Sequence, residues 1–455
     1  MTTLLAGAAV VDISPRQWRG LMDGYGARTQ PSQGVHDPLF ARVLVLDYGG
    51  DDQCAIVGCD LLGIHPQLVA EVRRAVPSLC GIPAEQVMVA AAHNHAGPWG
   101  LRAGMFSQLA KELAADVARK IVGAVVFAHS QRRPATLKLG QAVVDTVSQN
   151  RRHPDWPIDP VLRLLLVDGE DGRPVASLVN FACHATVLSA ANLMLSAEFP
   201  GVACRIVREQ TGAPAVYLNG ACANVNPTWI RQDFDSVERV GQIIGGQALR
   251  LIGELQTLGP GQRADNIRWD EFTEKAVPGR ILEPRFRAAR REMELPLRPF
   301  QTDEEYAARI AELEGEAAPL AEGSDERREV MARLTHAQNE RWAGAWARRQ
   351  PQAATLRTEV QALSLGEGPS TSSGQGLALL ALPGEFFVET AEVIQAECGI
   401  PDLLVACYAN DYIGYVVPPE AYAQGGYEAG VTFCAPEAEA IVRRTAAAVL
   451  QSVCG

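Results

Sequence analysis

The sequence predicts an α/β protein with mixed sheets of the α+β kind, and three observations support this prediction. Short apolar runs of strand length alternate with longer stretches of helical periodicity along most of the 455 residues. Hydrophobic residues make up 47% of the chain and charged residues 21%, the balance of a globular protein with a large core. Several apolar runs end in His, Asn or Glu, which indicates that polar chemistry is concentrated at strand ends.

The first part of the chain alternates strands and helices. Its expected strands are rich in small and β-branched residues and are bounded by Gly, Pro, Asp or Asn: 5–13, 39–47, 53–59, 86–92, 136–147, 160–167, 176–181 and 215–218. Its expected helices show apolar residues at helical spacing: 66–75, 107–128, 201–211 and 235–255.

The composition changes in the second part. From 278 to 355 the chain is charged, and 304–316 and 325–349 are expected as two amphipathic helices. We therefore expect a helical insertion at 278–355 in a catalytic domain formed by 1–277 and 356–455. Such a hairpin can be a solvated cover, an oligomer contact or a lid over a site. Strands at 358–365, 377–382 and 403–407 and helices at 385–398 and 435–451 follow.

Charge and composition exclude several classes of protein. The net charge of −12 and the pI of about 5.3 argue against nucleic-acid binding. No apolar stretch reaches membrane-spanning length, and the first residues lack the basic region of a signal peptide. None of the ten cysteines forms a Cys-x-x-Cys pair. We expect a cytoplasmic protein that acts on a small molecule, with homo-oligomer formation left open.

Histidines follow two of the apolar runs. The run 87–92 leads into His93 and His95, and the run 176–183 leads into His184. Side chains at i and i+2 of an extended chain share a face, so His93 and His95 can share a site. A single histidine after a strand is more often a hydrogen-bonded structural residue, but the recurrence favours a cluster of metal ligands.

Four other stretches carry candidate site residues. The glycine-rich loop 24–28, which contains Tyr25, either lines a pocket or forms a surface turn. The loop 148–154 places Arg151 where it could hold a carbonyl or anionic group, or be a solvated basic turn. The loop 219–228 is rich in amides and small residues, which suits close approach to a ligand. Five of the nine tyrosines lie between 408 and 427, a density that indicates a site.

The chain resembles the catalytic domain of the neutral/alkaline non-lysosomal ceramidase family in four motifs, which occur in the family's order. They are His-Asn-His-Ala-Gly-Pro at 93–98, Phe-Ala-Cys-His at 181–184, Pro-Gly-Glu-Phe at 383–386 and the tyrosine-rich segment 412–428. The resemblance therefore spans nearly the whole chain.

The resemblance implies a zinc site and the residues around it. Zinc would be held by His93, His184, Glu385 and Tyr415, and the groups acting on the substrate would be His95, Arg151 and Tyr427. The substrate contacts that we expect are Asn224, Asn226, Tyr412 and Tyr25. Two neutral nitrogens and a carboxylate leave Zn²⁺ electrophilic, with an open position for water.

Two features depart from the family's pattern. The family's Asp-Val-Ser-Pro segment corresponds to 224–227, so that Asn226 stands in place of the serine associated with ceramidase activity. The chain also ends at Gly455, before the family's C-terminal immunoglobulin-like domain, and a secretion signal is not expected. These features suggest a cytoplasmic, bacterial-type relative with a changed substrate.

We therefore predict a zinc-dependent hydrolase in which zinc-bound hydroxide attacks an amide of a small soluble substrate. Three alternatives stay open. The enzyme could be an esterase or lactonase, or a true ceramidase. The chain could also be a metal-binding protein without catalysis.

Overall fold

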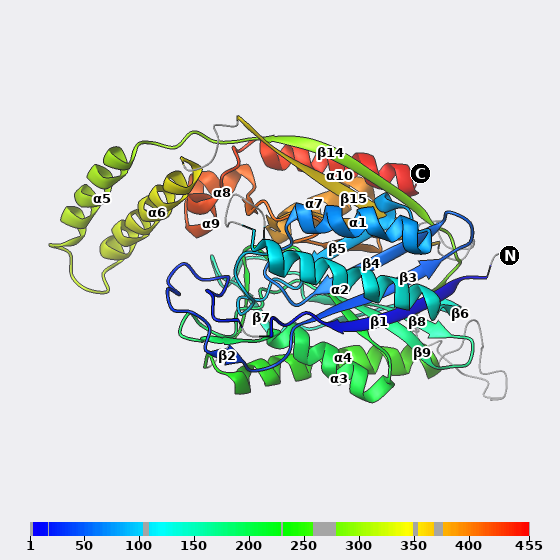
Figure 1. The fold of residues 1–455 in the computed structure, drawn as a ribbon. Helices are drawn as coiled ribbons and strands as arrows, with labels where there is room; N and C mark the ends of the chain where they lie inside the picture. The colour runs from blue at the N-terminus through cyan, green and yellow to red at the C-terminus, as the bar shows by residue number, and fades with distance from the viewer. Residues whose placement is uncertain are drawn as a thin grey trace, which may run out of the picture.

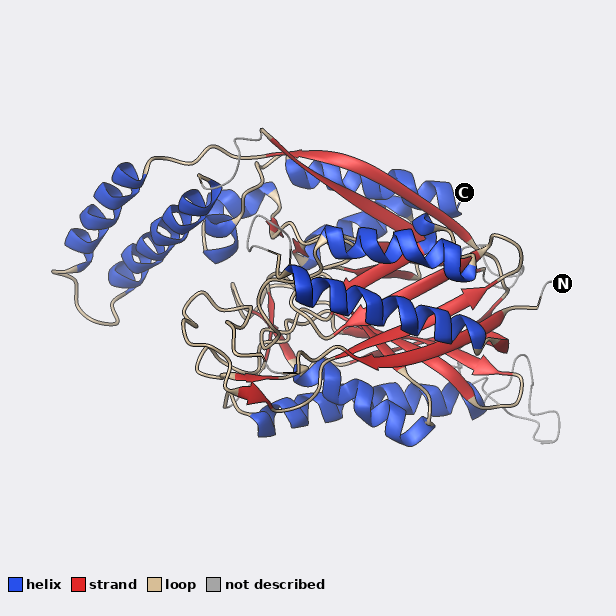
Figure 2. Ribbon diagram, viewed as in Figure 1, coloured by secondary structure: helices blue, strands red, loops and turns tan. Residues whose placement is uncertain are grey.

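Two sheets and the helices packed on them make up the body of the protein (Figures 1 and 2). In a computed structural model, residues 3–16, 18–102, 109–228, 231–257, 279–348, 354–367 and 376–454 are described. The larger sheet has the order β11-β9-β8-β6-β1-β3-β4-β5, with β13 added on β6. Its strands are β1 (Leu5–Asp12), β3 (Phe40–Asp47), β4 (Gln53–Cys59), β5 (Val87–Ala91), β6 (Arg133–Val143), β8 (Val161–Gly169), β9 (Pro174–Phe181), β11 (Ala215–Asn219) and β13 (Gly279–Leu282).

The larger sheet curls so that its two ends meet. Pairing is antiparallel along its middle and parallel at both ends, where β4 pairs with β5 and β9 pairs with β11. Gly58 in β4 lies so close to β11 that an added Cβ would be 2.7 Å from the Tyr217 carbonyl oxygen. Because the two ends meet, the carboxyl ends of β5 and β9 lie on one side of the body.

The smaller sheet joins the larger one through an asparagine. Its strands are β14 (Arg287–Pro296), β15 (Thr355–Gly366), β16 (Leu377–Ala381) and β18 (Leu403–Ala406), in that order. Just after β18, Asn410 adopts a left-handed backbone conformation with φ +62°. Its backbone N–H donates to the Val89 carbonyl at 2.7 Å, and its side-chain oxygen accepts from the Val89 N–H at 3.0 Å. The smaller sheet is thus attached to β5.

Helices cover the sheets on their outer faces (Figure 2). α2 (Lys111–Ser130) packs on β1 and β3 and beside α1 (Pro66–Cys80), while α4 (Phe234–Thr257) packs on β6 and β8 and beside α3 (Glu198–Thr211). α10 (Ala438–Cys454) covers β14 and β15 and contacts α7 (Val388–Cys398). The buried face of α1 repeats at helical spacing through Leu68, Val69, Val72 and Val76. None of the helices in the described ranges has the length and apolarity needed to cross a bilayer.

The segment expected as a helical insertion contains strands as well. β13 and β14 open it and pair with β6 and β15, so 279–296 belongs to the two sheets. The helical part is α5 (Asp303–Ala317) and α6 (Asp325–Ala347), which extends away from the sheets in Figure 1. A small cluster holds these helices together: Leu313, Ala317, Val330, Leu334 and Ala337. Thr302 and Ser324 cap their first turns. The division of the chain into domains stays a prediction.

The predicted fold class, α/β with mixed sheets, is confirmed. The structure corrects the expected element at Glu385. We expected a helix from Glu385, but Glu385–Phe386 is the short strand β17, and α7 begins at Val388. β17 pairs in parallel with β19 (Tyr415–Val416), a partner distant in sequence that local patterns do not reveal.

Substitution of Asn410 should destabilise the protein because it breaks the joint between the sheets. In Asn410→Ala the buried Val89 N–H loses its side-chain acceptor, and alanine tolerates a positive φ less well than asparagine does. We expect the free energy of unfolding, measured by urea titration, to fall by about 2–4 kcal/mol. The exposed Gln131→Ala serves as the control and should stay within about 0.5 kcal/mol of the wild type. An unchanged midpoint in Asn410→Ala would contradict this account of the joint.

Candidate metal centre

Two histidines lie just past strand ends, as predicted, and face one buried space. His93 follows β5 and His184 follows β9. The Nδ1 of His93 donates to the Leu62 carbonyl at 2.8 Å, and the Nδ1 of His184 donates to the Cys222 carbonyl at 2.6 Å. A carbonyl only accepts, so Nδ1 carries the proton and each Nε2 presents a lone pair. This is the orientation that metal-binding histidines adopt.

An asparagine at the end of β11 holds both histidine-bearing segments together. The Asn219 side-chain N–H₂ donates to the carbonyls of Ala92 and Cys183, each at 3.0 Å. These two carbonyls belong to the residues immediately before His93 and His184. Asn219 opens the loop 219–228 that we expected near a ligand, but its role in joining the two histidine segments was not predicted, because the sequence does not show which segments it contacts.

Glu385 is the third group at this position, beside His93 and His184. Its Oε2 lies 3.4 Å from His93 Nε2 and 3.3 Å from His184 Nε2. Its other oxygen, Oε1, accepts a hydrogen bond from the Tyr412 hydroxyl. The predicted substrate contact Tyr412 therefore holds the carboxylate in the structure, although nothing in the sequence linked the two side chains.

His95 belongs to the same group of imidazoles, but not for the reason that we predicted. Its Nε2 is 3.1 Å from His93 Nε2, and the ligand atoms of His93, His95 and His184 all lie within 4.8 Å of one another. We expected an extended chain to place His93 and His95 on one face. Instead His93 has φ +61°, a left-handed conformation, so the chain turns there. Backbone strain of this kind, in a residue other than glycine, is typical of functional sites.

The buried atoms of this group fit a cation. His184 Nε2 and Glu385 Oε2 are buried and have no hydrogen-bond partner. Burying such groups unpaired costs several kcal/mol, roughly, whereas a shared metal ion satisfies both. Imidazole nitrogens with a carboxylate oxygen form a donor set that suits Zn²⁺. Tyr415, predicted as a fourth ligand, lines the same cavity, and its hydroxyl accepts from Arg151 at 3.1 Å.

Burial and nearby charge keep the imidazoles of His184 and His95 neutral. Burial, reinforced by the positive charge of Arg151, lowers the pKa of His184 to about 4. Burial also holds the pKa of His95 well below its ordinary value, and the neighbouring His93 and His184 act in the same direction. Burial opposes ionisation of Glu385, but His93 and His184 overcome it and hold the pKa of that carboxyl well below its usual range. His184 and His95 therefore offer neutral nitrogens beside the ionised carboxylate of Glu385.

Arg151 follows a short strand that pairs with the segment containing Asn226. β7 (Ser148–Asn150) and β12 (Val225–Pro227) form an antiparallel ladder, although we expected both stretches as loops. The ladder brings Arg151 NH1 within 3.5 Å of Asn226 Oδ1. Arg151 Nε donates to Glu428 at 2.7 Å, and this partly buried ion pair fixes the guanidinium.

Tyr427 and Tyr25 each pack edge-on against a residue of the site. Tyr427, the first residue of α9 (Tyr427–Val431), is 49% exposed and sits edge-on to Tyr415 with ring centroids 5.8 Å apart. Tyr25 packs edge-on against His95 at 5.0 Å and donates its hydroxyl to the Leu188 carbonyl at 2.6 Å. Its ring thus supports His95, while its hydroxyl is already engaged.

Asn224 differs from the expectation of a substrate contact. It is fully buried, its Nδ2 donates to Glu389 at 2.8 Å, and its Oδ1 accepts from the Val388 N–H at 3.1 Å. Both ends of the amide are therefore occupied in holding the start of α7. The sequence could not distinguish this helix anchor from a ligand contact, because both use the same side chain.

The cavity at the histidines is small and contains residues that the sequence analysis missed. Its volume is about 50 Å³, and its lining includes Leu62, His95, Arg102, Trp342, Glu385 and Tyr412. Arg102 Nε pairs with the buried Asp23 at 2.9 Å. Trp342 comes from α6, in the charged segment where no motif indicated a site.

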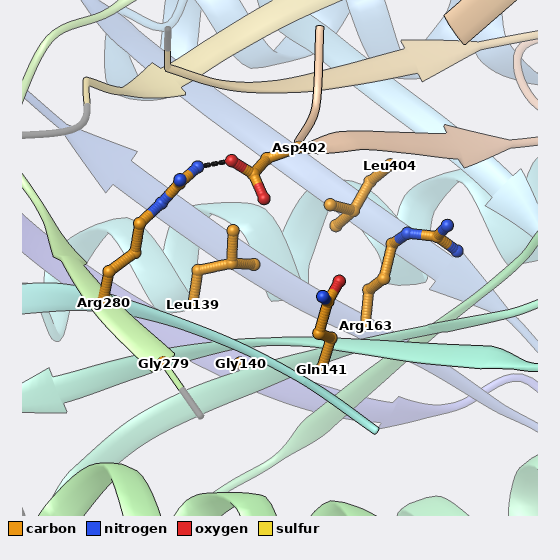
Figure 3. A pocket seen from close by; sticks show the side chains of 8 residues that line it. All are labelled: Leu139, Gly140, Gln141, Arg163, Gly279, Arg280, Asp402 and Leu404. Carbon is orange, nitrogen blue, oxygen red and sulfur yellow. Dashed lines mark ion pairs between the residues drawn. The ribbon is translucent and has the colours of Figure 1, made fainter. Parts of the chain in front are cut away.

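Larger cavities lie elsewhere on the molecule. One of about 430 Å³ is shown in Figure 3, where Arg280 points toward Asp402 above Leu139 and Gln141. Another, of about 620 Å³, lies between Phe40 and the helices α3 and α4. None of the predicted site residues lines either cavity. The chemistry is therefore concentrated in the small cavity.

Comparison with known proteins points to one family. Residues 4–220 match the model of the neutral/alkaline non-lysosomal ceramidase N-terminal domain. The neutral ceramidase of Pseudomonas aeruginosa is 22% identical over 95% of this chain and 70% of that protein. The neutral ceramidase of Mycobacterium tuberculosis is 24% identical over 94% of this chain and 74% of that protein. The crystal structure of the P. aeruginosa enzyme superposes with a TM-score of 0.74 at 21% identity, over 99% of this chain and 75% of that one, which shows a shared fold.

Loss of the Tyr412 hydroxyl should weaken metal binding without removing any ligand. In Tyr412→Phe the Glu385 carboxylate loses the hydrogen bond that orients it. We expect zinc affinity, measured by competition with a chromophoric chelator, to fall about 10- to 100-fold. Tyr422→Phe removes a tyrosine hydroxyl that donates to the Cys434 carbonyl instead, and it should bind zinc like the wild type. Equal affinities in the two variants would contradict this role of Tyr412.

The stability of the metal-free protein should fall as the pH falls from 7 to 5. The pKa of His184 is lowered to about 4 in the folded state, from an ordinary value of 6.5. Below pH 6.5 the unfolded chain binds a proton that the folded chain does not, so folding becomes less favourable. Urea titration after EDTA treatment should show a loss of about 2 kcal/mol from this residue between pH 7 and pH 5.

Two variants check the assignment of that pH dependence. His184→Gln should lose this part of the slope, and the half-exposed His153→Gln should retain it. A wild-type slope in His184→Gln would show that another group is responsible.

Proposed function

This chain is related to the neutral/alkaline non-lysosomal ceramidases, and from that premise we propose that it is a zinc-dependent hydrolase that cleaves an amide bond in a small soluble substrate. The observation that carries the proposal is the convergence of three groups. His93 Nε2 and His184 Nε2 both lie within 3.4 Å of Glu385 Oε2. His184 Nε2 and Glu385 Oε2 lack hydrogen-bond partners. An electrophilic cation is the species that such a donor set fits.

The chain would hold the ion through His93, His184 and Glu385, with Tyr415 beside them. Zinc, when bound, supplies a Lewis acid that polarises a carbonyl and lowers the pKa of water from about 15.7 toward about 7. The hydrogen bonds from Nδ1 of each histidine and from Tyr412 to Glu385 fix the ligands in advance, so little reorganisation is required.

Arg151 is placed to bind the substrate carbonyl. Its guanidinium is fixed by Glu428 and Tyr415, and NH1 still faces Asn226 at 3.5 Å. A fixed positive charge in a partly buried site stabilises negative charge that develops on a carbonyl oxygen. The resemblance to the family places Asn226 where a serine is expected, and this change beside Arg151 supports a substrate other than ceramide.

His95 and Tyr427 would move protons. Because burial holds the pKa of His95 low, its imidazole is neutral at pH 7 and can accept a proton during attack. The same group can then return the proton to the leaving amine. Tyr427 offers a second O–H donor at the half-exposed rim of the site.

Metal content and turnover should be lost together when a ligand is removed. Glu385→Gln and His184→Ala should contain almost no zinc by elemental analysis and hydrolyse no N-acyl amino acid, whereas Asn226→Ala should keep its zinc. Removal of zinc from the wild type by a chelator should abolish activity, and added zinc should restore it.

A substrate panel distinguishes the alternatives. Amide cleavage is expected for N-acyl amino acids, while turnover of lactones alone, or of a fluorescent ceramide alone, would favour the esterase or ceramidase alternative. Full activity in a variant that lacks zinc would exclude the proposed mechanism.

A further inference from the structure

The space next to the histidines is too small for a large substrate. The cavity of about 50 Å³ compares with roughly 300–1,000 Å³ for sites that enclose drug-sized ligands. One water molecule needs about 10–15 Å³ of such space, so the cavity has room for a few waters or one compact group. The residues that close it therefore decide what can reach the metal centre.

Two half-exposed aromatic side chains stand at the rim of this cavity. Tyr427 is 49% exposed and comes from α9, and Trp342 is 42% exposed and comes from the last turns of α6. Both line the cavity together with His95 and Glu385. Tyr427 lies in the motif that resembles the family, whereas Trp342 belongs to the helical hairpin. The hairpin thus contributes a wall to the site.

Close packing between α6 and α9 holds Trp342 in this place. An added Cβ on Gly430 of α9 would lie 2.9 Å from Asn339 Cβ of α6, so there is no room for a side chain at Gly430 and the two helices pack closely there. His336 Nδ1 donates to the Gly426 carbonyl at 3.0 Å. Figure 1 shows the consequence, with this end of α6 running beside α8 (Pro419–Gln424) and α9 while α5 extends outward.

An arginine strengthens the same junction. Arg298 donates to the carbonyls of Ala429 at 3.1 Å and Gly430 at 2.8 Å, the last turn of α9. It also pairs with Glu340 at 3.2 Å, two residues before Trp342. These contacts fix the part of α6 that carries Trp342, so the ring is held as a wall of the cavity.

From this geometry we propose that Trp342 determines substrate size and restricts the metal centre to short-chain acyl amides. The proposal rests on the proposed function, because it assumes that the acyl carbonyl binds beside Glu385. A longer acyl chain that leaves the centre on this side meets the indole ring. Removal of the ring would open the cavity toward solvent between α6 and α9, and longer chains would then find apolar surface there.

Binding of straight-chain acyl hydroxamates tests this inference independently of catalysis. Acetohydroxamate through decanohydroxamate would be titrated calorimetrically into the zinc-loaded protein. In the wild type, affinity should stop rising after the first few carbons. In Trp342→Ala, affinity should continue to rise by up to about fourfold per added methylene, and Trp342→Phe should give an intermediate limit. The kcat/KM values for N-acyl amino acids should shift toward longer chains in the same order.

Control variants separate this role from a general effect on the hairpin. Met331→Ala removes a large exposed side chain three turns away on α6 and should keep the wild-type length limit. Circular dichroism and thermal melting would show that each variant is folded. The same length dependence in wild type and Trp342→Ala would overturn the inference while leaving the metal centre intact. Failure of every hydroxamate to bind any variant would overturn the inference together with the proposed metal centre.

Discussion

His184 Nε2 and Glu385 Oε2 face each other at 3.3 Å, both buried and both without a hydrogen-bond partner, and the rest of the site is arranged around that contact. Removing an ionised carboxylate and a lone pair from water is unfavourable unless a cation or a proton is shared between them. The surrounding hydrogen bonds do not relieve this problem. These hydrogen bonds hold the imidazole and the carboxylate so that His184 Nε2 and Glu385 Oε2 stay directed at each other.

The body of the protein provides the rigidity that this arrangement needs. The larger sheet curls until β11 touches β4, and Asn219 then ties the residues before His93 and His184 to each other. Asn410 fastens the smaller sheet to β5 in a similar way. Both asparagines bridge carbonyl and amide groups that ordinary strand pairing leaves without partners. The site is therefore built on strand ends, which are more precise supports than free loops.

The hairpin gives this chain a feature that its family resemblance did not predict. A shared fold fixes where the ligands converge, but the cavity above them is closed by a tryptophan from a charged helix. The proposed limit on acyl-chain length follows from this wall. Asn226, which stands where the family resemblance expects a serine, lies 3.5 Å from the Arg151 guanidinium.

The sequence by itself determined the fold class, most strands and helices, and the positions of His93 and His184 past strand ends, because these follow from local periodicity. It also supplied Glu385 through its motif and Arg151 through a basic loop. The tertiary structure decided how these groups meet. The turn at His93, the β17–β19 pair, the helix-anchoring role of Asn224 and the arrival of Trp342 all depend on contacts between distant segments. Local patterns fix which face a side chain occupies, whereas convergence is set by packing across hundreds of residues, which no single stretch encodes.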